Sequence, residues 1–155
     1  MSEIERIRDQ LRRALEGEAW HGPSLREALA GVGAGIASAR PIPGAHTIRE
    51  LVHHLAAWHG VVRRRLEGEA VHEPEEGDFP DGEDGSEQGW QALLEKLEAR
   101  NRELLDTVAR VDGARLDEPV LEGWSSTYSN LHGTAQHALY HAGQIVLLRK
   151  AVAGG

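Results

Sequence analysis

The chain has no cysteine among its 155 residues, and it is short of aromatic side chains, with one phenylalanine and two tyrosines. The absence of cysteine excludes disulfides, thiolate zinc sites and a cysteine nucleophile. Any thiol chemistry therefore needs a small-molecule thiol from outside the chain. No run approaches the roughly 18 apolar residues of a membrane span, and the charged N-terminal segment lacks the apolar core of a signal peptide. We therefore expect a cytoplasmic protein without a membrane partner.

Positive charge is also scarce, since 17 Lys and Arg stand against 25 Asp and Glu, which gives a formal net charge of −8. Nucleic acids bind basic surfaces, so the composition predicts no nucleic-acid partner and favours a small-molecule substrate. No GxxxxGK[ST] stretch is present, so a phosphate-binding P-loop is excluded. In contrast, the chain has nine histidines, and histidine is the commonest side-chain ligand of metals in proteins.

Apolar residues recur at spacings of three and four in several segments, which indicates amphipathic helices. The four main segments are residues 4–15, 47–66, 90–111 and 128–152. A shorter helix is predicted over residues 24–31, where Ser24 and Glu27 have the spacing of a capping box. No segment alternates apolar and polar residues for long enough to predict a strand. The sequence therefore predicts an all-α fold, a four-helix bundle in a single domain over residues 1–155.

A long acidic loop over residues 67–89 separates the second and third main helices and contains no Lys or Arg. Its length exceeds an ordinary connection and allows a crossover, so simple up-down-up-down order is not assured. Asp78, Asp81, Glu83 and Asp84 suggest a calcium site, but their spacing is not that of an EF-hand loop. We expect a solvated acidic loop.

The stretch "HALYHAGQ", residues 137–144, places polar groups on the inner face of the last predicted helix. His137 and His141 lie about 40° apart around the helix axis, whereas His132 lies on the opposite side and is expected to face solvent. Residues four apart stand about 5–6 Å from each other at Cβ, close enough to bind one ion. Gln144 can orient a ligand, or satisfy buried backbone or a dimer partner. Tyr140 borders the same face.

A third ligand is expected from the helix over residues 47–66, which carries three histidines. His53 lies on the far side of that helix, while His54 and His59 lie at the two edges of the apolar stripe. The spacing alone does not choose between His54 and His59. Histidines that bind no metal would each need a hydrogen-bond partner in the core, so a purely structural role is the alternative.

Two stretches resemble the signatures of a known family. "TIRELVHHLAAWH" and "LHGTAQHALYHAGQIVLLRK" are similar to the second-helix and last-helix signatures of the DinB-like superfamily of metalloenzymes. "WHGPSLREAL" and "ARPIPGAH" are similar to the early part of such proteins. The resemblance covers nearly the whole chain except the acidic loop.

The resemblance implies a four-helix bundle that forms homodimers and binds nickel or zinc through three histidines. By motif these are His54, His137 and His141, which selects His54 over His59. Characterised relatives include transferases and isomerases that use low-molecular-weight thiols.

Three hypotheses about function follow. The first is a metal-dependent enzyme, either a thiol-dependent transferase or a hydrolase, with Gln144 and Tyr140 as candidate substrate-binding residues. The second is a non-catalytic stress protein that binds metal or a small ligand, and the third is a helical scaffold. Three protein ligands leave a coordination position open, as in catalytic rather than structural zinc sites, and this favours the enzyme.

Overall fold

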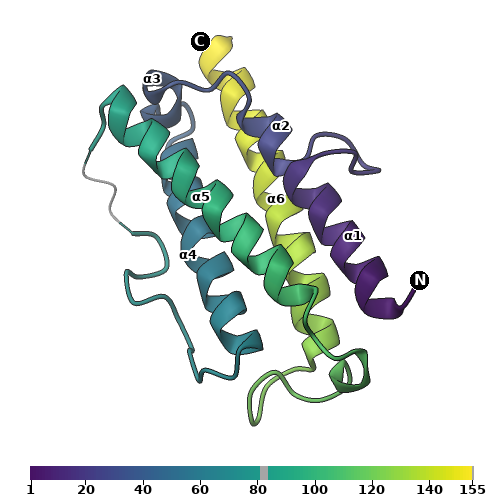
Figure 1. The fold of residues 1–155 in the computed structure, drawn as a ribbon. Coiled ribbons are helices and arrows are strands. Elements are labelled where there is room, and N and C mark those ends of the chain that lie inside the picture. Colours follow the sequence, from purple (N-terminus) through teal and green to yellow (C-terminus); the bar gives the residue numbers. More distant parts are fainter. Residues whose placement is uncertain (81–83, 155) are drawn as a thin grey trace.

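The computed structural model describes residues 1–80 and 84–154 as a bundle of four long helices (Figure 1). The long helices are α1 (Glu3–Glu16), α4 (Ile48–Leu66), α5 (Glu87–Val108) and α6 (Thr127–Ala153). Two short helices, α2 (Leu25–Leu29) and α3 (Ala34–Ser38), follow α1, and a 3₁₀ turn spans Gly113–Arg115. Residues 1–80 and 84–154 contain no strand, so the predicted all-α four-helix bundle is confirmed.

Capping boxes fix the starts of α4 and α2. At the start of α4, the Thr47 hydroxyl accepts the Glu50 N–H at 3.1 Å, and the Glu50 carboxylate accepts the Thr47 N–H at 2.8 Å. Ser24 and Glu27 form the same arrangement before α2. Such reciprocal bonds satisfy backbone donors that a helix start leaves free. They fix where α4 begins, and hence which of its faces carries each histidine.

The direction of the helices requires a crossover. Arg49 near the start of α4 lies over the ring of Trp90 near the start of α5, at 5.6 Å from the ring centroid. At the other end, the Thr107 hydroxyl of α5 donates to Glu67 at 3.2 Å. Helices α4 and α5 are therefore parallel, and the connection between them runs back along the bundle (Figure 1). We call its first part, residues 67–80, the crossover segment.

The crossover segment is largely exposed, as expected for a solvated acidic loop, but it is also attached to α4. Arg65 donates from Nε and Nη2 to the main-chain carbonyls of Val71 and His72, at 2.6 Å each. Arg64 pairs with Glu69 at 2.8 Å. The loop has no Lys or Arg of its own, but arginines at the end of α4 donate hydrogen bonds to its carboxylates and carbonyls.

The acidic residues compared with a calcium site do not all fall in the described part of the chain. Asp81 and Glu83 lie outside the described residues. Asp84 accepts the Ser86 N–H at 2.9 Å just before α5, and Asp78 contacts α4, as described below.

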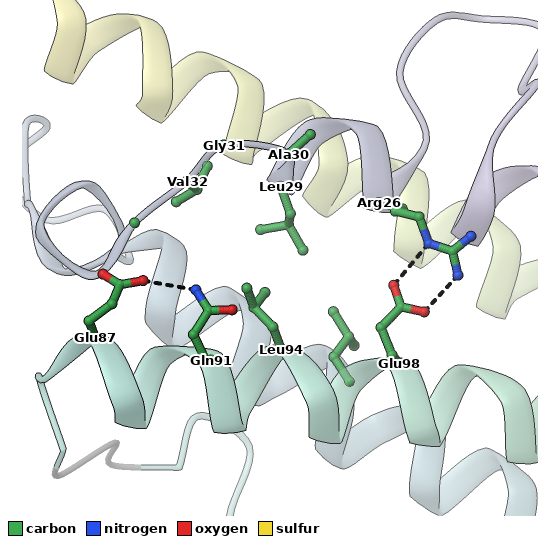
Figure 2. A pocket seen from close by; sticks show the side chains of 11 residues that line it. Arg26, Leu29, Ala30, Gly31, Val32, Glu87, Gln91, Leu94 and Glu98 are labelled. Carbon is green, nitrogen blue, oxygen red and sulfur yellow. Dashed lines mark hydrogen bonds and ion pairs between the residues drawn. The ribbon is translucent and has the colours of Figure 1, made fainter.

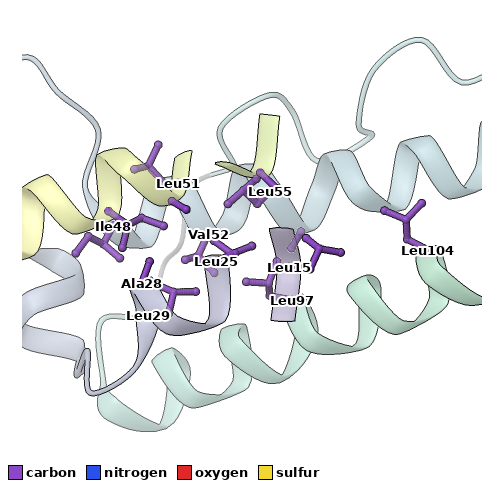
Figure 3. Close-up of a cluster of buried hydrophobic side chains, with 14 of the residues drawn as sticks. Leu15, Leu25, Ala28, Leu29, Ile48, Leu51, Val52, Leu55, Leu97 and Leu104 are labelled. Atoms are coloured by element: carbon purple, nitrogen blue, oxygen red, sulfur yellow. The ribbon is translucent and has the colours of Figure 1, made fainter. Parts of the chain in front are cut away.

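The core is rich in leucine and draws on every long helix. Figure 3 shows the contributions of α1, α2, α4 and α5. Leu15 of α1, Leu55 of α4, Leu97 of α5 and Leu131 of α6 are all buried. Each such side chain contributes about 1.5–3 kcal/mol when it is fully removed from water. This packing fixes α4 and α6 relative to each other, so the side chains between them have defined positions. No helix in the described residues has the length and apolarity needed to cross a membrane.

Candidate metal centre

Three histidines from two helices meet between α4 and α6. The Nε2 atom of His137 lies 2.9 Å from Nε2 of His54 and 3.0 Å from Nε2 of His141. The ligand atoms of all three lie within 4.8 Å of one another. His54 and His141 are each 6% exposed. The structure thus brings together the three residues that the resemblance implies as metal ligands.

Hydrogen bonds on the outer side of two rings fix which nitrogen faces the centre. Nδ1 of His54 lies 2.7 Å from the main-chain carbonyl oxygen of Asp78, and Nδ1 of His141 lies 2.6 Å from Oε1 of Gln144. Both oxygens only accept, so each Nδ1 carries the proton and each Nε2 of these neutral rings has a free lone pair. Metal-binding histidines are commonly oriented in this way.

The donor set fits a cation. The single Nε2 of His137 faces two nitrogen lone pairs, and one N–H there could donate to only one of them. A divalent ion accepts all three lone pairs, and imidazole nitrogens suit zinc, copper, iron and nickel. The residues present therefore fit a transition metal ion.

Burial keeps these rings in the form that binds metal. Removal from water, together with the nearby His141 and His54, lowers the pKa of His137 to about 3. Burial also lowers the pKa of His141, against the opposing hydrogen bond to Gln144. Both rings are therefore neutral at physiological pH, and metals bind neutral imidazole.

The crossover segment covers His54. The Asp78 carboxylate accepts the Trp58 Nε1–H at 2.7 Å and lies 3.2 Å from Nδ1 of His54. The Phe79 ring stacks on His54, with centroids 4.2 Å apart and planes 10° apart, and on His46, at 3.7 Å and 7°. Sequence reasoning missed the roles of Asp78 and Phe79, because their contacts with α4 depend on the path of the crossover and leave no local spacing signal.

His59, the alternative to His54, lies outside the cluster. It is fully buried, and its Nδ1 lies 2.7 Å from Oδ1 of Asn101 on α5. Burial lowers the pKa of His59 to about 4. Asn101 is 2% exposed, so the bond between the two side chains lies inside the core.

Helices α4 and α6 carry two further histidines, His53 and His132, whose predicted positions can be compared with the structure. His53 is not part of the three-histidine cluster, in line with its predicted place on the far side of the helix, and burial and the nearby Lys96 of α5 lower its pKa. His132 was expected to face solvent, and this is wrong, since its Nε2 is buried and has no hydrogen-bond partner among the described residues. Its ring lies 4.3 Å from that of Tyr128. The reason is that α6 packs against α1 as well as α4, so more than one of its faces is covered.

A cavity of about 420 Å³ opens beside His54 and His137. Trp58 and Val62 of α4 give it an apolar side, while α6 and the turn before it supply polar groups. Its lining residues are His54, Trp58, His59, Val62, Asp78, Ser125, Ser129, Asn130, Gly133, Thr134 and His137. A small molecule in this cavity would lie directly beside the histidine cluster.

Gln144 and Tyr140 do not belong to the described lining of that cavity. Gln144 bonds His141 instead, and it lines a separate cavity of about 240 Å³ together with His46. The ring of Tyr140 lies 5.1 Å from that of His141, but the side chain is 65% exposed. The structure therefore places Gln144 as a support for His141, and Tyr140 on the surface.

A larger cavity of about 540 Å³ lies between α5 and the segment that contains α2 (Figure 2). Arg26 and Glu98 form an ion pair of 2.6 Å beside it. The Glu87 carboxylate accepts hydrogen bonds from the Ala34 N–H and the Gln91 amide, at 2.8 Å each. Its charged groups are thus already paired, and no histidine is among its described lining residues. The smaller cavity beside the cluster is the one with reactive groups.

Comparison with known proteins identifies the family. The model of the DinB superfamily matches residues 19–145. The chain belongs to the DinB superfamily. No curated protein matches it. Among solved structures, the DinB-superfamily chain is similar to the one titled the conserved protein of locus from Enterococcus faecalis, with 19% identity and a TM-score of 0.74. The similarity covers 100% of this chain and 99% of that one, and at such low identity it shows the fold alone.

Proposed function

We propose that this DinB-superfamily protein is a metal-dependent enzyme in which His54, His137 and His141 bind a divalent transition metal, nickel or zinc. The observation that supports the proposal most directly is the convergence of three Nε2 atoms, two of them held as free lone pairs by partners on the outer side of the ring. When bound, such an ion supplies Lewis acidity and lowers the pKa of a thiol or water that reaches it. Three protein ligands leave room for a substrate.

The reaction that we propose is group transfer with a low-molecular-weight thiol. The chain has no cysteine to act as the nucleophile, so the thiol comes from solution. The cavity beside His54 and His137 has the volume for a small molecule, with Trp58 against its apolar part and Asn130 against its polar part. In this proposal the chain binds and orients the thiol and its partner, and Gln144 keeps Nε2 of His141 free.

A non-catalytic metal-binding role is the second candidate, and one contact favours it. The carboxylate nearest the cluster, that of Asp78, is already engaged by Trp58 and by His54. No other Asp or Glu is among the described residues that line the cavity. Proton transfer would then depend on the substrate or on water.

The proposal is tested by metal analysis followed by thiol titration. Protein purified without chelator is expected to contain one transition metal ion per chain. Calorimetric titration of the zinc-loaded protein with cysteine, a simple thiol, is expected to show binding that disappears in the metal-free protein and in His137→Ala. Stoichiometric metal without thiol binding would reject the thiol-dependent reaction and favour the non-catalytic role. Absence of metal binding would reject the proposal altogether.

We also propose that the protein forms a homodimer through α6. Tyr140 and Leu147 lie seven residues apart on one face of this helix and are 65% and 59% exposed. Such apolar side chains on one face suit burial against a second copy. Light scattering of the wild type and of Leu147→Asp tests this, since the substitution is expected to produce monomers. A wild-type monomer would reject it.

A further inference from the structure

We propose that Asp78 and Phe79 are positioning residues for His54, so that docking of the crossover segment on α4 and binding of metal at the cluster are coupled. This inference rests on the proposed metal site. It goes beyond that site because it assigns a role to the acidic connection between α4 and α5, which contains none of the proposed ligands.

His54 is the ligand whose position most needs support. His137 and His141 are one turn apart on α6, so the helix itself sets their separation. His54 comes from a different helix, and its ring must turn to the correct angle to meet them. Without outer contacts, an imidazole can rotate about its side-chain bonds and carry its proton on either nitrogen.

The crossover segment removes both freedoms of the His54 ring. The main-chain carbonyl of Asp78 accepts the Nδ1–H at 2.7 Å, which leaves Nε2 as the free lone pair. Phe79 lies flat on the ring, with planes only 10° apart, and so fixes the angle of the ring plane. Phe79 is itself held on its other face by His46, at 3.7 Å between centroids. The Asp78 side chain adds a bond to Trp58, one turn further along α4.

Because these contacts join the crossover segment to a proposed ligand, coupling must act in both directions. A docked crossover holds His54 ready to bind, which raises metal affinity. By thermodynamic reciprocity, bound metal stabilises the docked crossover by the same factor. Residues 67–80 should therefore exchange their amide hydrogens more slowly when metal is present.

The test compares substitutions within the crossover segment. Phe79→Ala removes the flat contact on His54, Phe79→Leu keeps much of the volume without the flat ring, and Phe79→Tyr keeps the ring. Glu76→Gln is the matched control, because it weakens an exposed pair with Lys96 of 3.5 Å on the same segment without touching His54. Zinc affinity is measured by competition with a chromophoric chelator, and amide exchange of residues 67–80 with and without zinc.

We expect zinc affinity to fall about 10-fold in Phe79→Ala and Phe79→Leu, the lower end of the range for loss of a group that orients a ligand. Phe79→Tyr and Glu76→Gln should stay near wild type. Zinc should slow exchange in the crossover segment of the wild type and have little effect there in Phe79→Ala. Far-ultraviolet circular dichroism checks that each variant is folded, and Phe79→Leu keeps the test valid if the alanine variant is not.

Two results would overturn the coupling. One is wild-type zinc affinity in both Phe79→Ala and Phe79→Leu, and the other is crossover exchange that zinc leaves unchanged. If either occurs while the wild type binds zinc and His137→Ala does not, the metal site stands and only this inference fails. If the wild type binds no zinc, both the metal site and the coupling are rejected.

Discussion

Helix α4 carries two buried histidines, His54 and His59, which have similar hydrogen bonds at Nδ1 but differ at Nε2. Each ring donates its Nδ1–H to an oxygen at 2.7 Å, from Asp78 in one case and Asn101 in the other. Each is at most 6% exposed. Their Nε2 atoms differ: in His54 this atom faces another imidazole, and in His59 it has no hydrogen-bond partner among the described residues.

The contrast teaches that burial and a fixed tautomer do not by themselves make a metal site. His59 is five residues after His54, about 140° further around the helix, so it faces α5, where Asn101 meets it. His54 faces α6, where two further imidazoles stand one turn apart. Convergence of nitrogen atoms from two helices is the property that separates the two environments.

The largest expected effect comes from removing a converging nitrogen. His137→Ala should lower zinc affinity by more than the roughly 10–100-fold that loss of a merely orienting residue costs, because His137 contacts both other rings. His132→Ala, on the same helix, should bind zinc as the wild type does. Chelator competition measures both, and equal affinity in the two variants would contradict the assignment of the helix face.

Low pH should destabilise the fold through His59, the buried histidine outside the cluster. The pKa of His59 is about 4 in the folded chain against an ordinary value of 6.5, so the unfolded chain takes up this proton first as pH falls. The free energy of unfolding is therefore fully retained above pH 6.5 and decreases between about 6.5 and 4. The contribution is at most roughly 3 kcal/mol, at about 1.4 kcal/mol per pKa unit.

Urea unfolding of the metal-free protein between pH 7.5 and about 4.5 measures this slope. His137 acts in the same direction because its pKa is also lowered, so His59→Leu should make the decline shallower without abolishing it. An unchanged slope in His59→Leu would show that this ring does not contribute.

Asn101→Ala, a substitution on α5, tests whether the surroundings of His59 and those of the histidine cluster are independent. It leaves the buried Nδ1–H of His59 without its acceptor, which should cost about 1–3 kcal/mol of unfolding free energy. Zinc affinity of the folded variant should stay unchanged, since the cluster does not contact Asn101. Urea unfolding and chelator competition on the same sample separate the two effects, and a parallel loss of zinc affinity would mean that the two environments are not independent.

These contrasts also show how far the sequence could lead. The i, i+4 spacing places His137 and His141 on one face because that relation is local to a helix. The choice between His54 and His59 depends on how α6 is oriented against α4, which the apolar stripe does not encode. The family resemblance chose His54, and the structure places that residue with the other two.

The features that the sequence analysis missed share a cause with that ambiguity. Composition predicts a solvated loop, and the crossover segment is largely exposed, but composition does not predict that Arg64 and Arg65 of the preceding helix bind this segment. Helix α3 was not predicted because its glycines weaken the helical pattern, yet Trp90 of α5 donates to the carbonyl of Val32 at 2.6 Å just before it. In each case the deciding partner is distant in sequence.

The smallest expected effect concerns Gln144, which supports His141 as Asp78 supports His54. Gln144→Ala removes the acceptor at 2.6 Å, so the His141 proton is free to move to Nε2, and zinc affinity should fall about 10-fold. Water can partly replace the amide, because Gln144 is only half-buried. Gln144→Glu keeps an accepting oxygen and should restore the affinity, while Tyr140→Phe, beside the same ring, should leave it unchanged. If Gln144→Ala binds zinc as tightly as the wild type, the α6 helix alone fixes His141, and only the ligand from α4 needs outside support.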